Sequence, residues 1–168
     1  MPWPLMISFT KNLGWTKEFN MRLGISSWAF QWLAGRPNHP PEAPLTPIGL
    51  LDKADELDIG VVQIADNLPL HTYSDEVIDT FGEEANRRNI TVELGTHGID
   101  VDNLLRYLEI AKQCGSTLVR ANFSRPEKEK EAVDLLKVAI HAYEEANIFL
   151  ALENYDNFPV SELAHIIR

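Results

Sequence analysis

The sequence predicts an α/β fold with parallel strands, because five short apolar runs each precede a segment with helical periodicity. The runs begin near Arg22, Val61, Thr91, Thr117 and Phe149, a recurrence of about 30 residues that is typical of repeated strand–helix units. Units of this length imply parallel strands joined by right-handed crossovers. A closed barrel needs eight such strands and about 250 residues, and this sequence has 168 residues. We therefore predict an incomplete (β/α)8 TIM barrel: its first five βα units, with the strands in sequential order.

Each strand and helix is predicted from its own local pattern. The expected N-caps of the first three helices are Thr46, which is followed by Pro47, then Ser74 and Asp100. A fourth helix is expected to begin at about Pro126. The strands are expected at residues 23–26, 61–65, 92–94, 118–121 and 149–152. Helical spacing predicts that the inward-facing residues are Ile48, Leu51, Ala54 and Leu57, then Val77, Ile78 and Phe81, then Leu104, Leu105, Leu108 and Ala111, and finally Val133, Leu136, Ile140 and Tyr143.

Composition narrows the function classes. The formal net charge of −10 argues against nucleic acid as a partner, because phosphate binding needs clustered Lys and Arg. No run approaches the roughly 18 apolar residues of a membrane span, so we expect no membrane partner. The single cysteine, Cys114, excludes an internal disulfide and suits a reducing, cytoplasmic compartment. Residues 1–20 are expected to be an irregular N-terminal extension, or an arm that covers the barrel bottom, and residues 21–168 form the partial barrel.

A second architecture also satisfies alternating strands and helices, namely an open doubly wound sheet. The Gly-rich phosphate-binding pattern of dinucleotide folds is absent after the first strand, where residues 26–30 read SSWAF. This absence weakens the Rossmann option. A flavodoxin-like binding module, which five strands would complete, stays open as a non-catalytic alternative.

Chemistry in a parallel barrel is expected at the carboxyl ends of the strands and in the loops that follow. A polar residue that closes an apolar strand must be solvated, paired or metal-bound. Those positions hold Ser27, Trp28 and Phe30 after the first strand, Asp66, Asn67 and His71 after the second, Thr96 and His97 after the third, Arg120 and Asn122 on the fourth, and Glu153 on the fifth.

Each candidate also has a purely structural interpretation. Arg120 is either an ion-pair partner of Glu93 or Glu153, or a clamp for an anion. Trp28 and Phe30 are either core cover or an apolar wall for a sugar ring, and His71 is expected to be a surface loop residue. Cys114 and His141 fall on helices and are expected to be packing residues.

Three segments in the same order and spacing resemble the sugar phosphate isomerase/epimerase family of xylose isomerase-like TIM barrels. They are residues 60–70 (GVVQIADNLPL), 93–99 (ELGTHGI) and 151–156 (ALENYD). The similarity covers about residues 21–168, which correspond to roughly the N-terminal two-thirds of a typical member. Two positions differ from the family pattern: His97, where arginine is common, and Tyr155, where histidine is common.

The resemblance implies a metal-dependent isomerase or epimerase acting on a sugar or sugar phosphate through an enediolate. Glu153 matches the glutamate that binds the divalent ion (Mn²⁺, Mg²⁺, Co²⁺ or Zn²⁺) and also transfers the proton. Their places at the strand ends further lead us to expect that the substrate is bound by Trp28, Phe30, Asp66, His97, Arg120 and Asn122. The other three metal ligands of the family would come from strands six to eight, so we predict that this chain is a truncated fragment that is inactive, retains no metal, and is poorly soluble or homo-oligomeric.

Other functions remain as alternatives. Endonucleases that cut at abasic DNA sites share the fold, but they need a basic surface that this acidic chain lacks. The non-catalytic alternatives are a flavodoxin-like binding module and a truncated pseudoenzyme acting through protein contacts.

Overall fold

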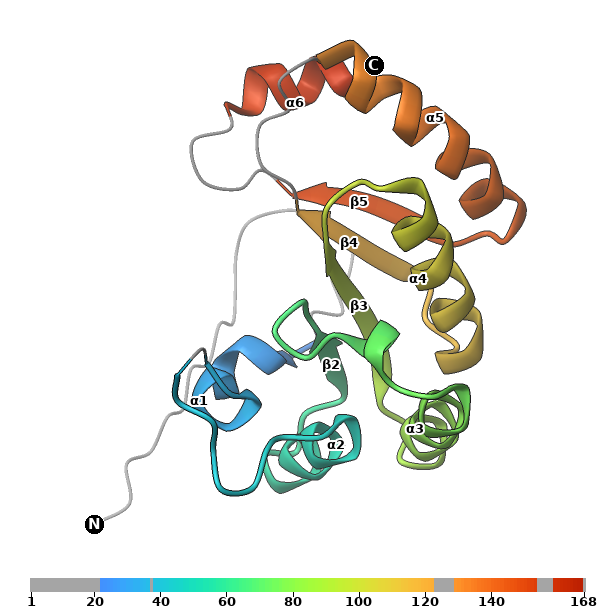
Figure 1. Cartoon of the computed structure of the whole chain (residues 1–168). Helices are drawn as coiled ribbons and strands as arrows, with labels where there is room; N and C mark the ends of the chain where they lie inside the picture. Colours follow the sequence, from blue (N-terminus) through green and yellow to red (C-terminus); the bar gives the residue numbers. More distant parts are fainter. Residues whose placement is uncertain (1–21, 37, 123–128, 154–158, 168) are drawn as a thin grey trace, which may run out of the picture.

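The computed structural model describes residues 22–36, 38–122, 129–153 and 159–167 (Figure 1). The predicted extension 1–20 and the predicted start of the fourth helix near Pro126 lie outside these residues.

One parallel sheet contains all the named strands, and each strand pairs with its neighbour in the sequence. This order confirms the predicted α/β partial barrel and contradicts a flavodoxin-like sheet, whose strand order is 2-1-3-4-5. The strands are β1 (Gly24–Ser26), β2 (Val61–Ile64), β3 (Thr91–His97), β4 (Leu118–Asn122) and β5 (Phe149–Glu153).

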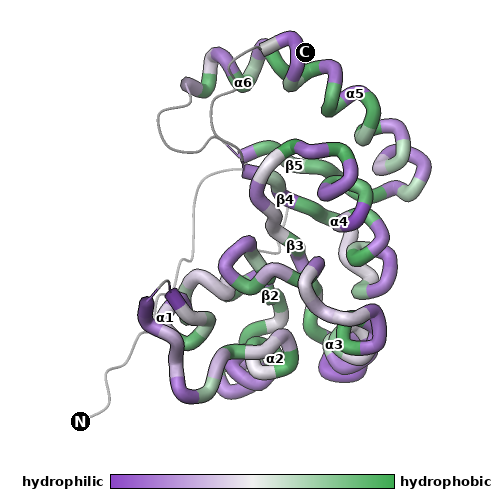
Figure 2. Tube along the Cα trace, viewed as in Figure 1, coloured by the Kyte–Doolittle hydropathy of each residue, from purple (hydrophilic) through white to green (hydrophobic). Residues whose placement is uncertain are grey.

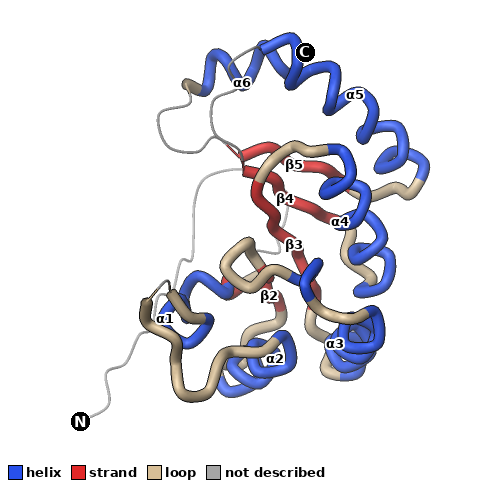
Figure 3. Tube along the Cα trace, viewed as in Figure 1, coloured by secondary structure: helices blue, strands red, loops and turns tan. Residues whose placement is uncertain are grey.

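Helices α2 to α5 pack against one face of this sheet (Figures 1 and 3). The short η1 and α1 that follow β1 were not predicted. The helical elements are η1 (Ser27–Phe30), α1 (Gln31–Ala34), α2 (Pro47–Glu56), η2 (Leu70–Thr72), α3 (Asp75–Arg87), α4 (Val101–Cys114), α5 (Glu129–Glu145) and α6 (Val160–Ile166). In the part of the chain that the structure describes, none of these helices is both long and apolar enough to cross a membrane.

The predicted helix ends are confirmed at α2 and α4. Thr46 Oγ1 accepts a hydrogen bond from the Gly49 N–H at 3.0 Å, and Asp100 Oδ1 accepts one from the Asn103 N–H at 3.1 Å. Gly115 ends α4 with a φ of +67°, a left-handed conformation that favours glycine. These local signals therefore fix where the helix containing Asn103 begins, which matters for the site described below.

The core lies between the sheet and the helices. Figure 2 shows hydrophobic residues along β5 and alternating hydrophobic and hydrophilic residues along α5. The strands contribute every second residue to this core, namely Val62, Ile64, Val92, Leu94, Val119 and Ala121, all of which are buried. The residues between them therefore point to the opposite, concave face, which carries the polar side chains.

Several predicted core positions are wrong. Leu57 is exposed because α2 ends at Glu56 and Leu57 no longer follows the helical period, whereas Leu50 is fully buried. Val77 is exposed because it lies one position off the buried stripe of α3. His141 is not a packing residue, because its side chain is 80% exposed on the outer side of α5.

Cys114 is a packing residue, as predicted. The thiol is buried at the end of α4, and burial raises its pKa to about 12. Because the thiolate is the reactive form, we expect the native thiol to react with a disulfide reagent such as DTNB at pH 8 at least a hundredfold more slowly than in the denatured chain. Equal rates in the two states would contradict the packing around α4.

Candidate functional site

Three predicted residues lie in one row across the carboxyl ends of β3, β4 and β5. The strand register pairs His97 with Asn122 and Asn122 with Glu153. Because Val119 and Ala121 face the helices, alternation places Asn122 and its two row partners on the concave face. We call His97, Asn122 and Glu153 the rim row.

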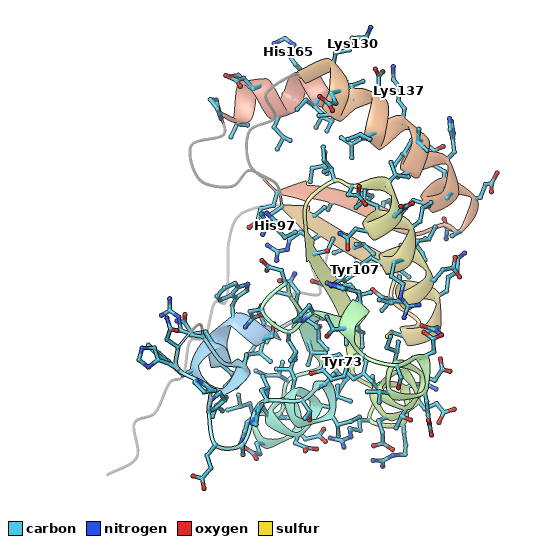
Figure 4. The ribbon with its side chains drawn as sticks, in the orientation of Figure 1. Tyr73, His97, Tyr107, Lys130, Lys137 and His165 are labelled. Atoms are coloured by element: carbon cyan, nitrogen blue, oxygen red, sulfur yellow. The ribbon has the colours of Figure 1, made fainter. Side chains whose placement is uncertain are left out.

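His97 and Asn122 are in direct contact. His97 Nδ1 lies 2.6 Å from Asn122 Oδ1, and Asn122 is only 5% exposed. Asn103 on α4 donates from Nδ2 to Thr96 Oγ1 at 3.0 Å and to the His97 carbonyl at 3.3 Å. The Gly98 N–H donates to the Asn122 carbonyl at 2.7 Å. The imidazole is thus anchored through both its ring and its backbone, at the end of the sheet to which β4 and β5 point (Figure 4).

Arg120 lies one row below and pairs with Glu153 through its Nη1. The Arg120 side chain is 19% exposed and that of Glu153 is 37% exposed, so the pair is partly shielded from water. Of the two partners left open by the sequence, the structure places Arg120 with Glu153. Glu93 instead accepts a hydrogen bond from Gln63 Nε2 at 3.4 Å. The guanidinium therefore fixes the orientation of the rim carboxylate.

Gly95 provides the space that Arg120 occupies. A Cβ atom at this position would lie 2.9 Å from Arg120 Nη2 and 3.1 Å from Ala65 Cα. Gly95→Ala is expected to displace the guanidinium and to lower the free energy of unfolding by about 2 kcal/mol, measured by chemical denaturation. Gly60→Ala is the control, because its added Cβ would make an ordinary van der Waals contact, 3.5 Å from Arg22 Nη2 at the end of a flexible side chain. Equal stability of the two variants would contradict the close approach at Gly95.

Trp28 and Asp66 form a second polar group on the neighbouring strand ends. The Trp28 indole Nε1–H donates to Asp66 Oδ1 at 3.0 Å, and the Trp28 side chain remains 47% exposed. Phe30 packs against the core cluster, which favours its interpretation as core cover. An exposed indole beside a carboxylate offers an apolar surface and a hydroxyl acceptor.

Ser27 ties the loop after β2 to the loop after β1. Its fully buried hydroxyl donates to Asn67 Oδ1 at 2.6 Å and accepts from the Ala65 N–H at 2.9 Å. Asn67 Nδ2 returns a hydrogen bond to the Ser27 carbonyl at 3.1 Å. These hydrogen bonds show that both residues stabilise the loops.

His71 lies apart from the rim row. Its Nδ1 is 3.1 Å from Tyr107 Oη, and the two rings meet edge to face. Tyr107 is almost fully buried on α4, and this burial raises the pKa of its hydroxyl. His71 is exposed, as predicted for a surface loop residue, and it secures the loop after β2 to α4.

Sequence reasoning missed Asn103 and Gly95 as parts of the site. Gly95 had a signal, since a glycine inside a strand often marks the close approach of another group. Asn103 had no such signal in the sequence, because only the fold brings the first turn of α4 to the end of β3.

The described residues do not form a metal site by themselves. Within residues 22–36, 38–122, 129–153 and 159–167, no three His, Cys, Asp or Glu side chains are grouped so as to hold an ion. Glu153 is the carboxylate of the rim row, and it forms an ion pair with Arg120.

A groove of about 620 Å³ lies elsewhere, between β5, α5 and α6. Leu136, Ile140, Leu150 and Leu152 contribute to its mainly apolar lining, and Lys137 and His165 stand near it (Figure 4). None of the rim-row residues lines this groove, and we therefore do not assign the candidate site to it.

The fold and the rim row together define a partial barrel with polar groups at the carboxyl ends of its strands. No family model matches the chain. The chain is 30% identical over 153 residues to the 3-oxo-isoapionate decarboxylase of Pectobacterium atrosepticum, a match that covers 88% of this chain and 54% of that enzyme. The chain thus spans about half the length of the curated relative that it matches.

Solved structures support the fold. An uncharacterised protein of Parabacteroides distasonis aligns with a TM-score of 0.57 at 17% identity, covering 80% of this chain and 53% of that one. A xylose isomerase-like TIM barrel/4-hydroxyphenylpyruvate dioxygenase fusion protein aligns with a TM-score of 0.59 at 12% identity, covering 88% of this chain and 24% of that one. The architecture is therefore similar to that of xylose isomerase-like TIM barrels.

Proposed function

We propose that this chain supplies the substrate-binding strands of an enzyme that acts on a sugar-derived substrate through an enediolate. The observation that carries the proposal is the rim row of His97, Asn122 and Glu153, with Arg120 paired to the carboxylate. Active sites of this architecture occupy the same end of the strands.

The chain's own residues account for binding and proton transfer. Glu153 accepts a proton from the carbon next to the substrate carbonyl, the C–H electron pair forms the C=C bond, and the carbonyl oxygen takes up the negative charge. Return of the proton to the neighbouring carbon, while the hydroxyl proton of the first carbon moves to the enediolate oxygen, completes an isomerisation. An epimerisation instead needs a second acid that adds a proton to the opposite face of the first carbon. Arg120 keeps the carboxylate oriented, while Trp28 and Asp66 offer an apolar face and a hydroxyl acceptor to the sugar.

A divalent metal ion is part of this proposal. When bound, an Mn²⁺, Mg²⁺, Co²⁺ or Zn²⁺ ion would stabilise the enediolate oxygens as a Lewis acid. Glu153 is the one ligand that we assign to it, so the remaining ligands would come from outside the described residues. We expect the purified 168-residue chain to retain less than about 0.1 equivalent of metal, measured by elemental analysis, because one carboxylate binds such ions weakly.

The similarity to a decarboxylase favours a second candidate within the same chemistry. Loss of carbon dioxide from a 3-oxo acid breaks the bond between the carboxylate and its neighbouring carbon. That electron pair forms the C=C bond of an enolate, and a proton is then added to the same carbon. The rim row serves both reactions, since each needs a stabilised enolate oxygen and a proton-transfer group.

The two candidates are separated by one set of incubations. The protein is mixed with ketoses, aldoses, their phosphates and 3-oxo-isoapionate in deuterated water, with and without each of the four metal ions. A new sugar isomer, or deuterium incorporation without loss of carbon dioxide, indicates proton transfer alone, whereas release of carbon dioxide indicates decarboxylation. The 168-residue chain is expected to be inactive, so a protein extended to the length of the decarboxylase relative is assayed beside it. An extended protein that gives neither product with any of these substrates would overturn the proposal.

A further inference from the structure

We infer that Asn122 is a positioning residue that fixes His97 in one tautomer, with hydrogen on Nδ1 and the lone pair of Nε2 turned to the substrate. His97 would then be the second catalytic residue of the rim row. The tautomer rests on the structure alone, whereas the role toward a substrate rests on the proposed function.

The contact between the two side chains determines the tautomer. Asn122 Oδ1 can only accept a hydrogen bond, so a separation of 2.6 Å requires His97 Nδ1 to carry the hydrogen. A neutral imidazole carries one hydrogen, and Nε2 is then an acceptor. Because Asn122 is 5% exposed, water does not compete effectively for its amide oxygen.

The order of groups in the rim row supports this orientation of the amide. Asn122 lies on β4 between His97 on β3 and Glu153 on β5. When Asn122 Oδ1 faces β3, the amide Nδ2 faces β5. There the Glu153 carboxylate can only accept hydrogen bonds, so it suits the amide N–H donors. The reverse orientation would turn an amide oxygen toward that carboxylate, which is unfavourable.

The backbone contacts keep the ring in place. Asn103 donates to the His97 carbonyl, and the following Gly98 N–H donates to the Asn122 carbonyl. The end of β3 is therefore held to α4 by Asn103 and to β4 by Gly98, which keeps the backbone of His97 in place. Arg120 and Glu153 are the charged groups nearest in the register, and they are paired with each other.

In this arrangement Nε2 serves one chemical step. A substrate hydroxyl gives its proton to the Nε2 lone pair, which leaves an alkoxide and an imidazolium with hydrogen on both nitrogens. The imidazolium later returns that proton to a substrate oxygen, so the group is unchanged after turnover. Adjacent strands are about 4.8 Å apart, so His97 and Glu153 lie two strand spacings apart on either side of Asn122. A substrate bound over this row would meet Glu153 at carbon and His97 at oxygen.

The test is a two-bond ¹H–¹⁵N correlation spectrum of the ¹⁵N-labelled chain, recorded at a pH at which the imidazole is neutral. The signals of His97 are assigned by their loss in His97→Gln. We expect a pyrrole-type shift for Nδ1 and a pyridine-type shift for Nε2. The opposite pattern would show that the amide is reversed and would overturn the inference, whatever the outcome of the substrate assays.

Two variants separate tautomer control from general packing. Asn122→Asp keeps an acceptor oxygen and is expected to preserve the Nδ1–H tautomer, whereas Asn122→Leu removes the acceptor and is expected to lose it. His71 is the internal control, because its Nδ1 contacts Tyr107 and its signals are expected to stay unchanged in both variants. An Nδ1–H tautomer that persists in Asn122→Leu would contradict the role of Asn122. If Asn122→Leu does not fold, the wild-type spectrum still decides the tautomer, and Asn122→Ala, which also lacks the acceptor, takes the place of the leucine variant.

Discussion

Glu153→Gln is expected to reduce turnover about a thousandfold while leaving the fold intact. Glutamine has almost the same shape, and its amide oxygen still accepts a hydrogen bond from Arg120 Nη1. It carries no negative charge, so it neither accepts a proton from carbon nor attracts a divalent cation. The loss should appear in kcat, because proton transfer takes place in the transition state rather than in substrate binding.

Glu93→Gln is the matched control for this prediction. Glu93 lies on the same concave face, on β3, but below the rim row, and it interacts with Gln63. The control makes the same chemical change on the same face and is expected to keep activity within tenfold of the parent. Turnover is measured in the extended protein if the 168-residue chain is inactive, and unfolding is followed by circular dichroism for each variant. Activity of Glu153→Gln within tenfold of the parent would rule out the proposed role of the carboxylate.

The strands and most helix ends could be predicted from the sequence, because each carries its own local signal. The apolar runs at Val61 and Leu118 predict strands because they are short and bounded by polar or turn residues. Thr46, Asp100 and Gly115 mark helix ends through their capping preferences. The strand order was less certain, because an open doubly wound sheet also satisfies alternating strands and helices, and the structure decides for the sequential order.

The residues of the rim row could be predicted from the sequence, but the contacts between their side chains could not. Polar residues at successive strand ends must meet at one edge of a parallel sheet, which is why His97, Asn122 and Glu153 were candidates. The choice of Glu153 over Glu93 as the partner of Arg120 depends on register and side-chain reach. The support from Asn103 depends on where α4 crosses the sheet. Such tertiary distances leave no periodic signal in the sequence.

The contact between α3 and α4 leads to the second large effect, which concerns stability. Gly82 lies in the middle of α3, and a Cβ atom there would lie 2.7 Å from the Gln113 carbonyl oxygen and 2.9 Å from Cys114 Cα. Both neighbours are backbone atoms, so a rotamer change cannot relieve the clash. The close approach of the two helices therefore requires glycine at this position.

Gly82→Ala is expected to lower the free energy of unfolding by about 2 kcal/mol, measured by urea denaturation. The sign is informative, because alanine in an unobstructed helix interior is favoured over glycine by about 1 kcal/mol. Thr80→Ala, an exposed change on the same helix, is the control and is expected to be neutral or slightly stabilising. Separation of the helices should also expose the Cys114 thiol, so Gly82→Ala should react faster with DTNB than the parent. A more stable Gly82→Ala with an unreactive thiol would mean that α3 and α4 do not approach as closely as described.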